Sequence, residues 1–192
     1  MTRLLTEYRA EVDPEGDSIL GPDSAPAFID YAISIGVDLE NAYYNGTVLS
    51  IAAYCGNPET VGHLIKRGAN VNSKCDMPDL ETWETPLHRA AFSAQKDDPT
   101  RDYPETVRLL VEGGADVNAR TNPGVSSDMA GQLVCQGEIP LHFAASRADS
   151  AVIQHLLDAG SVRDVRTSEE KTPWDCAVEA GRPQNILDML SP

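Results

Sequence analysis

One short phrase recurs along this chain and constrains its fold more than any other feature. The sequence TPLHRAA at residues 85–91 returns as IPLHFAA at residues 139–145, and weaker copies begin at Thr47 and Thr172. A second apolar stretch follows each copy, and three of these stretches end in a glycine (Gly68, Gly114 and Gly160). Self-similarity of this kind indicates a stack of repeated units, in which each unit completes the core of its neighbour.

Each residue of the phrase suits a particular position in a helix pair. Thr85 can cap a helix N-terminus with its hydroxyl, and Pro86 fits the first turn, where its missing N–H is not needed. Leu87 is expected to face the core, and Ala90 with Ala91 keeps the helix thin enough for a neighbour to approach. The second helix is expected to end at a glycine with positive φ. One such pair cannot bury both of its faces, so neighbouring pairs must stack.

These residues resemble the ankyrin repeat, whose pattern is TPLHxAA, a second helix, and then GADVN. The resemblance implies an all-α solenoid of stacked helix-turn-helix units with hairpin-like loops along one edge. It also implies a protein-binding role, through the loop tips and the concave face of the first helices, and no catalytic residues. It covers residues 41–192 as four repeats, with residues 1–40 as an irregular N-terminal capping repeat.

The spacing of the phrase locates the segments that depart from a regular array. The shortest interval, from Ile139 to Thr172, is the 33 residues expected of this repeat. The longer intervals place insertions at 75–83, 95–103 and 121–136. Long insertions in an economical repeat are often functional.

The N-terminal segment is predicted to contain two helices. The first covers residues 2–12, and the second is capped by Asp23 and Ser24 and continues through Ile35. The second helix is predicted to present one apolar face, made of Phe28, Tyr31, Ala32 and Ile35. At the other end of the chain, Trp174 occupies the Leu87 position of the phrase and is expected in the core.

Composition restricts the partners of the chain. Its net charge of −15 disfavours binding to nucleic acid or to anionic membrane surfaces, which both need Lys and Arg, and favours a basic protein surface. No apolar run is long enough to cross a bilayer, and the N-terminus lacks the pattern of a signal peptide. The four cysteines have neither the spacing of a zinc site nor that of a disulfide framework, so we expect reduced thiols and a cytoplasmic location.

Aromatic and charged residues on the exposed side of the repeats are the candidate partner-binding residues. Aromatic and arginine side chains supply most of the binding energy in many interfaces. Acidic residues cluster in the first long turn and would attract a basic partner. The predicted set is Tyr43, Tyr44, Tyr54, Asp76, Asp79, Glu81, Trp83, Glu84, Arg89, Phe92 and Arg147. An inhibitor, an immunity-type protein or a regulator would fit such a surface, by analogy with other acidic inhibitors. The aromatic residues could instead pack against the insertions and form a local core.

An enzyme is the main alternative, and a structural linker in a larger assembly is a third possibility. The insertions could fold over the concave face and enclose a small-molecule pocket lined by Tyr44, Tyr54, Trp83 and Phe92, with an acidic residue as acid or base. The sequence contains none of the common nucleophile, phosphate-binding or metal-binding motifs. We therefore expect no catalytic residues, no metal and no cofactor. His88 and His142 belong to the repeat phrase and are expected to be structural.

Overall fold

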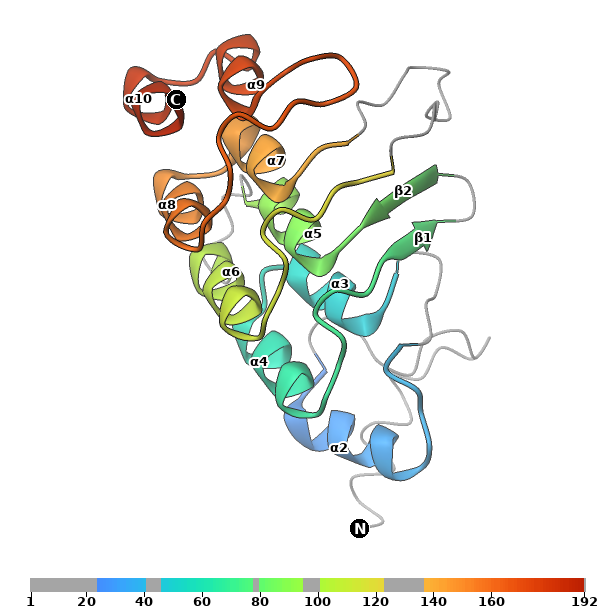
Figure 1. The fold of residues 1–192 in the computed structure, drawn as a ribbon. Coiled ribbons are helices and arrows are strands. Elements are labelled where there is room, and N and C mark those ends of the chain that lie inside the picture. Colours follow the sequence, from blue (N-terminus) through green and yellow to red (C-terminus); the bar gives the residue numbers. More distant parts are fainter. Residues whose placement is uncertain (1–23, 41–45, 78–79, 95–100, 123–136, 192) are drawn as a thin grey trace.

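The computed structural model describes residues 24–40, 46–77, 80–94, 101–122 and 137–191, with the backbone alone for 75–77 and 80–82. In this part of the chain the helices form successive pairs, stacked side by side (Figure 1). We call the first helix of each pair the inner helix and the second the outer helix. The pairs are α3 (Val48–Tyr54) with α4 (Pro58–Lys66), α5 (Pro86–Ser93) with α6 (Tyr103–Glu112), α7 (Pro140–Arg147) with α8 (Ser150–Asp158), and α9 (Pro173–Glu179) with α10 (Gln184–Leu190). An additional helix, α2 (Pro26–Ser34), precedes them and packs against α4.

The repeat phrase forms the inner helices for the expected physical reasons. The alanine pairs are fully buried in α3, α5 and α7, where each inner helix packs closely on the next. Leu87 and Leu141 are completely buried between the layers. The glycines that end the outer helices have φ near +90°, at Gly68, Gly114 and Gly160, a conformation that glycine adopts without strain. The fold predicted from the phrase is confirmed.

The histidine of the phrase connects one repeat to the next. In α5 the Thr85 amide donates to Nδ1 of His88 at 3.2 Å, so the ring proton lies on Nε2. Nε2 in turn donates to the backbone carbonyl of Glu138, also at 3.2 Å. His142 makes the equivalent contacts with Ile139 and Lys171. These two histidines are structural, as the resemblance implies.

The α2 helix differs from the prediction in the face that it buries. Phe28, Ile29 and Ala32 are buried, whereas Tyr31 and Ile35 are exposed. The apolar stripe is therefore rotated from the predicted one, because the side of α2 that meets α4 carries residues 28, 29 and 32. Asp30 joins the two helices through His63 and Arg67, each at 2.6 Å. The helix predicted over residues 2–12 lies outside the described residues.

The first predicted insertion, 75–83, forms an antiparallel hairpin. Its strands are β1 (Cys75–Met77) and β2 (Leu80–Glu84), with a register irregularity between Cys75 and Met77. The hairpin projects beside the inner helices (Figure 1). The other two insertions fall largely outside the described residues, at 95–100 and 123–136.

Trp174 is a correction to the sequence analysis. It was expected in the core but is 37% exposed. The leucine position of the phrase is buried only where the next inner helix covers it, and α9 is the last inner helix in the described part of the chain. Across the described ranges, no helix is both long enough and apolar enough to span a membrane.

Candidate functional site

Three aromatic rings form a continuous strip along successive inner helices. They are Tyr54 of α3, Phe92 of α5 and Phe143 of α7, and all three are half-buried. The centroids of Tyr54 and Phe92 are 6.5 Å apart in a stacked arrangement, and those of Phe92 and Phe143 are 6.1 Å apart, edge to face. These geometries are the favourable ones for aromatic pairs. We call these three residues the ring strip.

Two arginines lie over the ring strip. The guanidinium of Arg89 is 4.9 Å from the centroid of Tyr54, and that of Arg147 is 4.2 Å from the centroid of Phe92. Both distances are within the range of cation–π attraction, which aligns the guanidinium with the ring face. Aromatic and cationic groups therefore alternate along this surface. Their mutual contacts restrict the conformations of their side chains.

Two carboxylates occupy equivalent repeat positions beside these arginines. Glu84 comes directly before Thr85, and Glu138 comes directly before Ile139. Glu84 lies 3.4 Å from Arg89, and both side chains are largely buried. Burial raises the pKa of Glu84. Burial, followed by the charges of Glu84 and Glu169, raises the pKa of Glu138 to about 7.

Trp83 lies at the base of the hairpin, apart from the ring strip. Its side chain is 39% exposed, and the Lys74 ammonium is 4.9 Å from its ring centroid. The backbone of Trp83 has a φ of +51°, a left-handed conformation that costs about 1–2 kcal/mol for a residue with a Cβ. The fold thus holds a strained backbone at a position that carries an exposed indole. Such outliers tend to occur at functional positions.

The structure brings together Tyr54, Glu84, Arg89, Phe92 and Arg147 from the predicted set. Trp83 lies in β2 next to Glu84, but its ring contacts Lys74. The remaining predicted residues are not placed: Tyr43, Tyr44 and Asp79 lie outside the described residues, and the side chains of Asp76 and Glu81 are not described.

Two members of the cluster were missed by sequence reasoning. Phe143 occupies the phrase position of Arg89, and Glu138 occupies that of Glu84. The repeat register could have identified both, because equivalent positions on neighbouring repeats lie side by side in a solenoid.

The arrangement is suited to binding. His88 is completely buried, and burial lowers its pKa to about 4, so it is a neutral part of the scaffold at neutral pH. Among the residues that the structure describes, no group of three or more His, Cys, Asp or Glu side chains could hold a metal ion. Of the enzyme-pocket residues, Tyr54 and Phe92 are stacked on each other, whereas Tyr44 lies outside the described residues.

Comparison with known proteins agrees with this architecture. A family model described as ankyrin repeats (3 copies) matches residues 23–121. Rabankyrin-5 of Mus musculus is 30% identical over 140 residues, which cover 69% of this chain and 10% of that protein. Ankyrin repeat and SOCS box protein 3 of Homo sapiens is 29% identical over 138 residues (71% and 22%), and alpha-latrotoxin-Lg1a of Latrodectus geometricus is 28% identical over 173 residues (87% and 11%).

The chain therefore spans less than a quarter of the length of each of these relatives. The chain belongs to the ankyrin-repeat family.

Proposed function

We propose that the exposed side of the inner helices binds a protein with a basic surface. Ankyrin repeats are generally protein–protein interaction modules. The observation that carries the proposal is the ring strip with its two arginines, because aromatic and arginine side chains dominate the energy of many interfaces. Prior ordering of these side chains reduces the entropy that binding must overcome.

The acidity of the chain supports a basic partner. A net charge of −15 would steer such a partner toward the chain, and the half-buried Glu138, when ionised, would receive one of its cationic side chains beside the ring strip. A protein of this kind would act as an inhibitor or regulator by covering a basic surface. A cytoplasmic location is part of the same proposal.

Trp83 provides the test. Replacing it by glycine removes the exposed indole and also relieves the left-handed strain, so we expect partner capture to fall by about tenfold or more while the melting temperature stays constant or rises. Proteins retained on the immobilised chain would be quantified by mass spectrometry at low and high salt. Capture should weaken as salt increases.

Trp174→Ala is the matched control. It removes an equally exposed tryptophan from α9, a helix that contributes no residue to the hairpin or the ring strip. Equal loss of capture in both variants, or none with Trp83→Gly, would contradict the proposed role of Trp83. Capture that is independent of salt would contradict a basic partner.

A further inference from the structure

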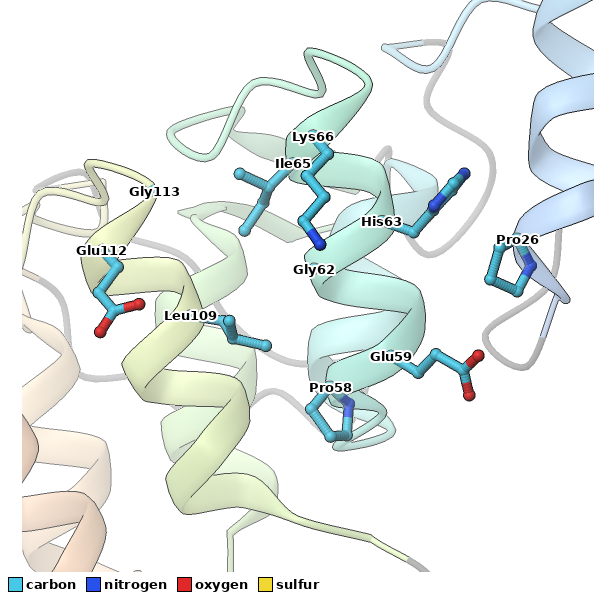
Figure 2. A pocket seen from close by; sticks show the side chains of 10 residues that line it. All are labelled: Pro26, Pro58, Glu59, Gly62, His63, Ile65, Lys66, Leu109, Glu112 and Gly113. Atoms are coloured by element: carbon cyan, nitrogen blue, oxygen red, sulfur yellow. The ribbon is translucent and has the colours of Figure 1, made fainter.

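A groove crosses the outer helices, on elements that the candidate site does not use. It lies over α4, between α2 and α6, and has a volume of about 470 Å³. Figure 2 shows the side chains of Ile65 and Leu109 directed into the space between α4 and α6, with Gly62 at its centre. Pro58 lines it at the start of α4, Pro26 on the side of α2, and Gly113 at the end of α6 (Figure 2). We call this feature the outer groove.

The groove is open at its centre because Gly62 has no side chain. Gly62 stands six residues before Gly68, and the equivalent positions of the next two repeats are Arg108 and Gln154. Both of those residues carry long side chains over their outer helices. Among these three repeats, the first alone has no side chain at this position.

Packing does not require glycine at this position. A Cβ on Gly62 would meet only Leu109, at 3.5 Å, which is ordinary van der Waals contact. Glycine inside a helix is destabilising relative to alanine, because it loses more backbone entropy on folding. Helix α4 thus carries an internal glycine that its own packing does not explain.

The charges on the rim indicate what the outer groove fits. Glu112 is engaged by Arg108, and His63 is engaged by Asp30. The side chains of Glu59 and Lys66 are both exposed. Neither side chain makes an ion pair or a hydrogen bond with the residues that the structure describes. They are seven residues apart on α4, which places them about 10 Å apart along the helix axis, on either side of Gly62.

We propose that the outer groove binds a helical segment of a partner protein. A large apolar side chain of that segment fills the space over Gly62, between Ile65 and Leu109. A basic and an acidic residue, two helical turns apart on the same face, pair with Glu59 and Lys66. This is the helix-in-groove mode of recognition, with apolar anchors spaced at three and four residues. The groove does not share residues with the ring strip, so the chain would hold two proteins at once.

The test uses three designed alanine-based peptides, each about 16 residues long so that they form helices. Each carries two central leucines between two charged residues seven positions apart, which are Lys and Glu, two Lys, or two Glu. Binding is followed by the amide chemical shifts of the full chain. We expect the Lys and Glu peptide to bind wild type most tightly, with the largest shifts at Gly62, Ile65 and Leu109.

Charge reversals and a filled groove give the decisive comparison. Lys66→Glu should change the preference to the two-Lys peptide, and Glu59→Lys should change it to the two-Glu peptide; ratios between variants cancel the effect of the overall negative charge. Gly62→Arg, which installs the residue of the next repeat, should weaken all three by about tenfold or more with no loss of melting temperature. The proposal would be overturned if the peptide preference did not follow the rim charges, or if Gly62→Arg bound the peptides as tightly as wild type. Chemical-shift changes confined to the ring strip would also overturn it.

Discussion

Replacement of Gly56 by alanine is expected to lower the free energy of unfolding by about 3 kcal/mol. Gly56 joins α3 to α4 with a φ of +64°, and a Cβ there would lie 2.8 Å from the ring of Tyr103. The ring cannot easily move, because Tyr103 is buried and its hydroxyl donates to the carbonyl of Tyr54 at 3.2 Å. The left-handed backbone contributes about 1–2 kcal/mol, and forced repacking of the ring contributes about 1–3 kcal/mol.

Gly68→Ala separates these two effects. Gly68 also has a positive φ, of +91°, but a Cβ there would meet nothing within 4 Å. We expect it to cost only the backbone strain, about 1 kcal/mol. Urea denaturation of both variants gives the comparison, and equal losses would show that the Tyr103 contact is not the cause. The displaced ring would also disturb the ring strip, because Tyr103 is hydrogen-bonded to Tyr54, the first member of the strip.

The repeat register predicts the scaffold more completely than the surface. The phrase at 85–91 was sufficient to predict the inner helices, because its proline, leucine and alanines each act within one helix pair. The prediction failed at Trp174, since burial at that position depends on whether another inner helix follows. The aromatic residues showed the same limit: Phe92 was selected, but Phe143 was not.

Contacts between repeats explain that limit. The stacking of Phe92 with Tyr54 and the position of Arg147 over its ring depend on three different repeats. The sequence of a single repeat does not reveal these contacts, because the contacting side chains belong to other repeats. The outer groove has a similar origin, because Gly62 is notable only beside Arg108 and Gln154 at the equivalent positions.

The second large effect concerns pH. At about pH 8, Glu138→Gln is expected to raise the free energy of unfolding by about 2 kcal/mol. Burial raises the pKa of Glu138 from 4.5 to about 7 in the folded chain, so the folded state favours the protonated carboxyl. The stability associated with that proton is fully present below about pH 4.5 and is lost as the pH rises through 7. The full shift corresponds to about 3 kcal/mol, and we reduce it because the side chain is only half-buried.

Glutamine carries no charge, so the Glu138→Gln variant does not lose this stability as the pH rises through 7. The groups that act on Glu138 are Glu84 and Glu169, which raise its pKa, and Arg147 and Lys171, which oppose them. Glu179→Gln is the control, because Glu179 is an exposed carboxylate that pairs with Lys171 at 2.9 Å. It should change stability by less than about 1 kcal/mol at any pH.

His88 has the opposite pH dependence and makes the experiment more specific. Burial lowers its pKa from 6.5 to about 4, so its contribution to stability is complete above pH 6.5 and is lost as the pH falls toward 4. Burial also lowers the pKa of His142, in the same direction. Between about pH 4.5 and 6.5 acidification lowers the stability contributed by the histidines and raises that contributed by Glu138, so Glu138 partly offsets the loss in wild type.

Glu138→Gln removes only the compensating gain. The stability of the variant should therefore fall more steeply than that of wild type from about pH 6.5 to 4.5. Chemical denaturation across this range, with two-state behaviour checked by fluorescence and circular dichroism, measures both curves. Parallel curves, or a variant less stable than wild type at about pH 8, would show that the folded chain does not favour the protonated form of Glu138. Convergence of the two curves toward pH 4.5 would instead place a titrating carboxyl at the edge of the ring strip, where a cationic partner would bind more tightly as that carboxyl ionises.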